Sequence, residues 1–114
     1  MHRLVVLALL VACRAKAPQG APCSAVATRQ RTLAEADLGS ATVDPATRRL
    51  VEQQLPGIRD ALDRACRDGA WSSGVRDCMV QATDHAAFQA CAQRLTDDQR
   101  RALDVVARGE TPRQ

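Results

Sequence analysis

Residues 44–69 read DPATRRLVEQQLPGIRDALDRACRDG, and this stretch decides the fold. Its apolar residues recur at intervals of three and four, which is the spacing of one face of an α-helix. Asp44 and Pro45 suit a helix start, because aspartate can cap a helix and proline is tolerated in its first turn. The sequence therefore predicts a long amphipathic helix whose apolar face is formed by Val51, Leu55, Ile58, Leu62, Ala65 and Cys66.

Pro56 and Gly57 interrupt this stretch, and an interior proline costs a helix about 3 kcal/mol. The apolar positions nevertheless keep the same helical phase before and after Pro56. A loop would normally shift that phase. We therefore expect one kinked helix from about 45 to 68, ended by Gly69.

Four further helical segments flank the long one, and none of them shows the alternation that is typical of a strand. One runs from about 24 to 38. Three shorter ones follow the long helix, starting at Ser72 or Ser73, at Thr83-Asp84 and at Thr96. Thr96 with Gln99 three residues later has the pattern of a capping box. The predicted fold class is all-α, a small disulfide-stapled helical bundle of about five helices.

The N-terminal sequence MHRLVVLALLVAC places a basic residue before nine apolar residues, which is typical of a secretory signal peptide. Nine helical residues span about 14 Å at ~1.5 Å per residue, too short for a hydrocarbon core of roughly 30 Å. The run ends in Leu10-Val11-Ala12-Cys13, which resembles the lipobox of bacterial lipoproteins. That resemblance implies that residues 1–12 are removed and that Cys13 carries a diacylglyceryl group on its thiol.

Two alternatives to a lipoprotein stay open. Ala15-Lys16-Ala17 fits an ordinary secretory cleavage site, and a cytoplasmic protein is the third interpretation. In a lipoprotein, acyl chains would hold the protein to the membrane, since each buried methylene contributes ~0.8 kcal/mol. Arg14 stands where an inner-membrane retention signal would place Asp, so the outer membrane is favoured over the inner membrane.

The mature chain divides into three expected parts. Residues 13–22 comprise lipidated Cys13 and a flexible tether, because they carry two prolines and a glycine and lack apolar periodicity. Residues 23–108 form the helical domain with two disulfides. Residues 109–114 are an unpatterned tail that we expect to be disordered.

Four cysteines remain after Cys13, and an even number in an oxidising compartment predicts two disulfides. Cys78 and Cys91 lie at nearly equal distances on either side of the Thr83-Asp84 turn, so antiparallel helices would bring them together. The favoured pairs are therefore Cys78–Cys91 and Cys23–Cys66, and the other two pairings stay open.

Metal, redox and catalytic sites find little support. Structural zinc sites usually contain a close Cys-x₂₋₄-Cys pair, whereas the intervals here are 42, 11 and 12 residues. The Cys-x-x-Cys motif of redox enzymes is also missing. His85 is the only histidine after Cys13, and the acids lie at helix starts or beside arginines. We expect no metal, no cofactor and no enzymatic activity.

The charge pattern also limits the partners. The net charge is only +3 and both signs are interspersed, which argues against nucleic-acid binding. Arg48-Arg49 and Arg100-Arg101 could bind anionic lipid or lipopolysaccharide, although a solvated helix face explains them more simply. Trp71 is expected in the core, and an exposed position would instead make it an anchor for a partner.

Leu95-Thr96-Asp97-Asp98-Gln99 resembles the LTxxQ motif of the Spy-type periplasmic chaperones, which generally carry the motif twice. The wider series of Cys66, Trp71, Cys78 and Cys91 followed by this motif resembles uncharacterised small cysteine-containing envelope lipoproteins. This second resemblance implies a shared fold and no particular activity.

The favoured function is an envelope-anchored lipoprotein with a non-enzymatic binding or structural role toward another envelope protein or a glycan. The alternative is a chaperone-like stress protein of the LTxxQ type that holds unfolded clients. The two differ in surface, because a chaperone needs a broad exposed apolar patch and an adaptor does not.

Overall fold

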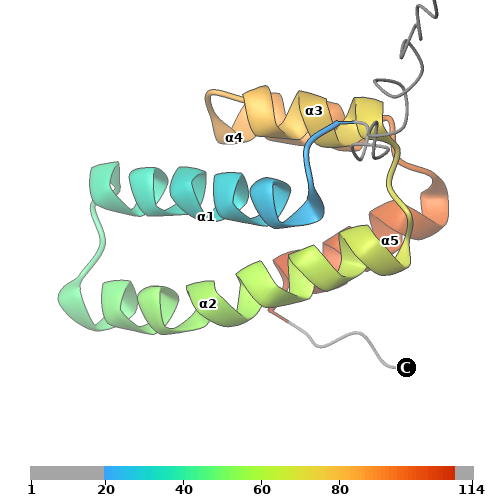
Figure 1. The fold of residues 1–114 in the computed structure, drawn as a ribbon. Coiled ribbons are helices and arrows are strands. Elements are labelled where there is room, and N and C mark those ends of the chain that lie inside the picture. The colour runs from blue at the N-terminus through green and yellow to red at the C-terminus, as the bar shows by residue number, and fades with distance from the viewer. Residues whose placement is uncertain (1–19, 110–114) are drawn as a thin grey trace, which may run out of the picture.

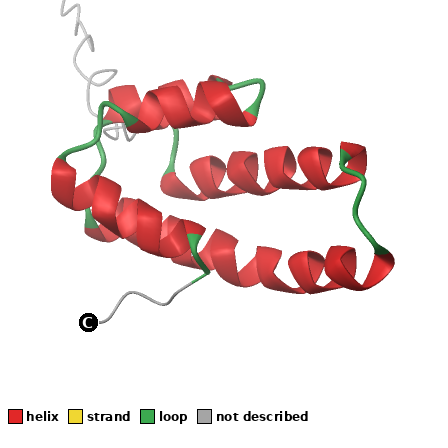
Figure 2. Ribbon diagram, turned by 180° about the vertical axis from the view of Figure 1, so that it is seen from behind, coloured by secondary structure: helices red, strands yellow, loops and turns green. Residues whose placement is uncertain are grey.

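A computed structural model describes residues 20–109, and these residues form five α-helices without a strand. Figures 1 and 2 show α1 and α2 as an antiparallel hairpin, α3 and α4 as a shorter pair beside α1, and α5 along the C-terminal half of α2. The all-α prediction is confirmed. The helices are α1 (Cys23–Ser40), α2 (Pro45–Asp68), α3 (Ser73–Gln81), α4 (His85–Ala92) and α5 (Asp97–Ala107).

Helix α2 is a single helix that contains Pro56, as its apolar phase predicted. At its start, the Asp44 carboxylate accepts hydrogen bonds from the backbone N–H of Thr47 at 2.7 Å and from its hydroxyl at 2.9 Å. These bonds favour the charged form of Asp44 and so lower its pKa. The ribbon continues through Pro56 and bends along its length (Figures 1 and 2), as expected where a proline removes one backbone donor.

The end of α2 is shaped by a close approach to Trp71. Gly69 caps the helix with φ −80°, and the positive φ that often follows a helix falls on Ala70 instead, at 48°. A Cβ on Gly69 would lie 2.9 Å from the carbonyl oxygen of Ala65 and 3.0 Å from Nε1 of Trp71. Gly69 is therefore required for space beside the indole.

One hydrophobic core joins all five helices, and Trp71 belongs to it with 3% of its surface exposed. This confirms the expected core position of Trp71. The apolar face of α2 packs in two different environments along its length. After Pro56 its residues, such as Leu62, enter the common core, whereas Leu55 is buried outside that cluster. The largest fully buried side chains are Phe88, Leu62, Met79, Val26, Val106 and Cys66.

Two disulfides cross-link the two helix pairs, in the pairing that the sequence favoured. Cys23–Cys66 joins the start of α1 to the end of α2, and Cys78–Cys91 joins α3 to α4. The two Cα atoms are 5.7 Å apart in each bridge. The first bridge closes a sequence separation of 43 residues and the second a separation of 13.

The chain is held to α3 before α1 begins. The backbone N–H of Ala21 donates to the Asp77 carboxylate at 2.7 Å, and Arg76 donates to the carbonyl of Ala21 at 2.6 Å. Gly20 has φ +84°, and a Cβ there would lie 2.8 Å from the Cβ of Ser73. Residues 20–22, assigned from the sequence to the tether, therefore belong to the folded unit. The predicted signal peptide 1–12, Cys13 with the rest of the predicted tether, and residues 110–114 of the predicted tail lie outside the described residues.

The two disulfides should differ in their contribution to stability. Replacing both cysteines of Cys23–Cys66 by alanine should lower the free energy of unfolding by about 4 kcal/mol, and the same change at Cys78–Cys91 by about 3 kcal/mol, because the longer loop loses more chain entropy when closed. Urea denaturation of both variants under oxidising conditions would measure this. An equal or reversed order would contradict the loop-length argument.

Candidate functional site

The cysteines and His85 are not arranged for metal or thiol chemistry in the part of the chain that the structure describes. Cys23, Cys66, Cys78 and Cys91 are all in disulfides. Within residues 20–109, no group of three or more histidine, cysteine or acidic side chains could hold a metal ion. His85 is exposed at the start of α4, and its Nε2 lies 3.4 Å from the side-chain amide nitrogen of Gln89.

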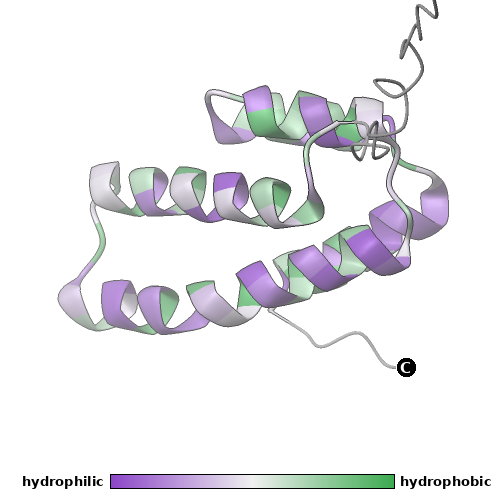
Figure 3. Cartoon of the chain, in the orientation of Figure 1, coloured by the Kyte–Doolittle hydropathy of each residue, from purple (hydrophilic) through white to green (hydrophobic). Residues whose placement is uncertain are grey.

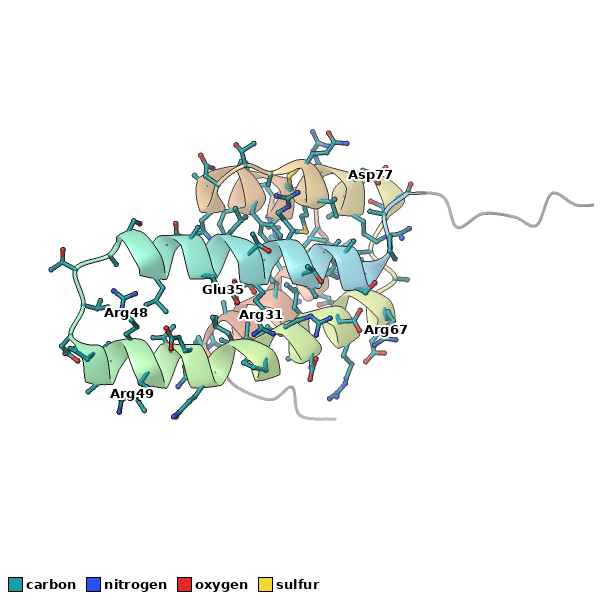
Figure 4. All side chains as sticks on the ribbon, turned by 60° about the vertical axis from the view of Figure 1, so that its left-hand side comes forward. Arg31, Glu35, Arg48, Arg49, Arg67 and Asp77 are labelled. Atoms are coloured by element: carbon teal, nitrogen blue, oxygen red, sulfur yellow. A yellow bond between two sulfur atoms is a disulfide. The ribbon has the colours of Figure 1, made fainter. Side chains whose placement is uncertain are left out.

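The arginine pairs serve mostly structural contacts. Arg48 donates to the carbonyl of Leu38 at 2.6 Å and to that of Ala41 at 3.3 Å, so it ties the C-terminal end of α1 to α2. Figure 4 shows Arg48 directed into the turn between the helices and Arg49 directed away. Arg100 and Arg101 form ion pairs with Asp97 and Asp98, respectively. Only Arg49 among these four lacks a partner within the described residues.

The LTxxQ segment forms a joint between α5 and the end of α2. Thr96 and Gln99 make the predicted capping box, at 3.2 Å from the Gln99 N–H to the Thr96 hydroxyl and 2.9 Å from the Thr96 N–H to the Gln99 side chain. The amide nitrogen of Gln99 also donates to the carbonyl of Gly69 at 2.9 Å. Leu95 is buried in the core. Each defining residue of the motif thus has a structural contact of its own.

The turn end of the α1–α2 hairpin extends beyond the other three helices (Figures 1 and 2). We call this part the hairpin tip and define it as residues 34–54. Leu50 lies on it with 60% of its surface exposed, and it is the one large hydrophobic side chain of residues 20–109 that is exposed to this degree. Figure 3 shows hydrophobic and hydrophilic residues interspersed along every helix.

Open pockets on the described surface include one of about 440 Å³ between α2 and α5 and one of about 340 Å³ beside the Cys78–Cys91 bridge. Another, of about 520 Å³, is lined by residues of α1, among them Arg29, together with Arg59 of α2 and Val80 of α3. Neither arginine stands out in the sequence. The Cys23–Cys66 pairing could have brought them together in a prediction, because both arginines are about two helical turns from that bridge.

A substitution at Gln99 separates its two roles. Gln99→Glu keeps an acceptor for the Thr96 N–H but removes the donor to the Gly69 carbonyl and places a carboxylate beside that oxygen. We expect it to lower the free energy of unfolding by about 1–2 kcal/mol in urea denaturation at neutral pH. The exposed control Gln93→Glu should change stability by less than about 0.5 kcal/mol. A Gln99→Glu protein as stable as the parent would show that the bond from Gln99 to the Gly69 carbonyl does not stabilise the fold.

Within residues 20–109, none of the helices has the length and apolar content needed to cross a membrane. Comparison of the chain with protein-family models, with curated proteins and with solved structures finds no match. The interpretation of the surface therefore rests on the geometry of this chain alone.

Proposed function

We propose that this protein is an envelope lipoprotein, anchored through Cys13, that binds another envelope component with its hairpin tip and catalyses no reaction. The membrane is thus its first partner, through the acyl chains. An envelope protein or a glycan is the second. The outer membrane is the favoured location, because Arg14 follows the proposed anchor.

The separation of the two ends of the α1–α2 hairpin carries this proposal. The chain enters the folded unit at residues 20–22, directly before α1. Helix α1 has 18 residues and is therefore about 27 Å long at ~1.5 Å per residue. The hairpin tip lies at the other end of that helix (Figure 1). A chain anchored near residue 20 would thus present the tip away from its anchored end.

The surface supports a binding role more than a chaperone role. A chaperone that holds unfolded clients needs a broad apolar patch. Leu50 is exposed at the tip without a second large hydrophobic residue exposed to the same degree in the described part of the chain. Such a surface suits a small, specific contact. The structural contacts of Leu95, Thr96 and Gln99 also account for the LTxxQ resemblance without a client-binding function.

The anchor is tested by intact mass of the protein purified from membranes. We expect a mature chain that begins at Cys13, carries added lipid mass and exposes four alkylatable thiols only after reduction. Cys13→Ser should remove the lipid mass and release the protein from the membrane fraction. The control variant with Cys78→Ser and Cys91→Ser should keep the lipid mass and stay in the membrane fraction. An unlipidated parent chain that still contains Met1 would refute the anchor.

The binding role is tested by photo-crosslinking in cells. A photoreactive residue at position 50 should give a discrete adduct, and the same residue at position 104, exposed on α5, should not. In the Cys13→Ser background the position-50 adduct should weaken at least several-fold, because the tip would no longer be held near envelope partners. Equal adducts from positions 50 and 104 would count against the tip as the binding surface.

A further inference from the structure

We propose that the pocket between α1 and α2 binds a phosphate group, held by Arg29 and Arg59. Both side chains line a pocket of about 520 Å³, a size within the usual range of small-molecule sites of roughly 300–1,000 Å³. They come from neighbouring antiparallel helices. A ligand between them would receive charge-assisted hydrogen bonds from two sides.

The Cys23–Cys66 bridge explains why the two arginines meet. Arg29 lies six residues after Cys23 on α1, and Arg59 lies seven residues before Cys66 on α2. At ~1.5 Å per residue these positions are about 9 Å and about 10.5 Å from the bridge along nearly antiparallel axes. The Cα atoms of Arg29 and Arg59 therefore lie at almost the same level of the hairpin, and both side chains reach the one pocket.

The surroundings of Arg29 and Arg59 distinguish them from the other arginines. Both are half-buried, and neither has a hydrogen-bond or ion-pair partner among residues 20–109. The remaining partnerless arginines, Arg49, Arg64 and Arg94, are exposed and can be hydrated freely. Both guanidinium groups are therefore available to pair with an anion in the pocket, and such a pair makes charge-assisted hydrogen bonds.

Hydroxyl groups add neutral donors to the same pocket. Ser24, Thr28 and Thr32 recur every four residues along α1 and form one row on its surface. The Thr32 hydroxyl already donates to the carbonyl of Thr28 at 3.0 Å. The hydroxyls of Ser24 and Thr28 stay free to donate to a ligand. The first turn of α1 has no side-chain cap, so its helix dipole adds positive potential at the Ser24 end.

The donor set suits phosphate better than carboxylate. A carboxylate has two oxygens in one plane, which a single guanidinium group can bind with two parallel N–H donors. Two arginines on different helices and a row of hydroxyls offer donors in several directions, which matches the tetrahedral oxygens of phosphate. On α2, Asp60 follows Arg59 directly and is exposed, and Asp63 lies one turn from Arg59. Asp63 pairs with Arg67 through one carboxylate oxygen, while its other oxygen is buried without a partner.

The assignment of the phosphate to a lipid headgroup rests on the proposed lipid anchor, whereas phosphate binding in the pocket does not. Gly20 follows Cys13 by seven positions, and this stretch of chain spans at most about 25 Å. On an anchored chain the pocket would stay within reach of phospholipid headgroups. A soluble phosphate compound has the same binding chemistry, so the experiment must separate the two sources.

The test uses arginine modification in the full-length protein purified from the fraction that contains it, in dodecyl maltoside micelles. Phenylglyoxal reactivity of each arginine is followed by peptide mass mapping, in inorganic phosphate or in chloride of equal ionic strength. At ten times the Kd, phosphate should slow modification of Arg29 and Arg59 by about tenfold, in proportion to the free fraction. Arg49 and Arg94 in the same molecules are the controls and should not change. Equal protection of all four arginines, or none, would overturn the proposal.

Variants test whether the two arginines share one ligand. Arg59→Gln should raise the phosphate Kd, measured from the protection of Arg29, by at least about tenfold. This change is equivalent to 1.4 kcal/mol of binding free energy. Arg94→Gln should leave that protection unchanged, and acetate should not replace phosphate. Retained protection of Arg29 in Arg59→Gln would overturn a shared site. Circular dichroism of both variants checks that the helices are intact.

A last experiment tests whether the phosphate comes from a lipid headgroup or from a soluble compound. Phosphatidylglycerol mixed into the micelles should protect Arg29 and Arg59 if lipid headgroups occupy the pocket. Protection by inorganic phosphate alone supports the pocket and assigns it to a soluble phosphate compound. If the proposed anchor is wrong, the intact mass will show an unlipidated protein. The protection of Arg29 and Arg59 by inorganic phosphate can still be interpreted in that case.

Discussion

The Cys23–Cys66 disulfide fixes which residues of α1 lie beside which residues of α2. With this register, Val26 and Leu62 enter the same buried cluster, each about one helical turn from the bridge. The opposite ends of the two helices then extend past α3, α4 and α5 as the hairpin tip. A sulfur bridge suits this chain because two of its 114 residues are aromatic and a core with few large side chains contributes less burial.

The three short helices are attached to this hairpin at its disulfide-bonded end. Trp71 links them to it, since the indole lies against Gly69 at the end of α2 and belongs to the common core. Gln99 then fastens the start of α5 to the carbonyl of Gly69. Arg76 bonds the carbonyls of Trp71 and Ala21, which holds the start of the domain to α3. One end of the bundle is thus bonded extensively, while the hairpin tip is held mainly by Arg48.

The sequence was informative wherever a feature depends on local chemistry. The phase of the apolar residues around Pro56 and the capping box of Thr96 and Gln99 use contacts within a few residues, so their spacing predicts them. The bond from Gln99 to Gly69 spans 30 residues, and the meeting of Arg29 with Arg59 depends on a helix register. Local periodicity does not encode such distances. The pairing of the cysteines would have supplied the register, but the sequence left three pairings open.

The α1–α2 hairpin carries both proposed sites at different distances from the start of the domain. The arginine pocket begins at Ser24, in the first turn of α1, whereas Leu50 lies on α2 near the far end of α1. On an anchored chain, an electrostatic contact near the membrane would restrict the orientation of a domain otherwise held by one tether. That restriction would lower the entropy that the hairpin tip loses when it binds a partner. The pocket would then strengthen binding at the tip without any contact between the two ligands.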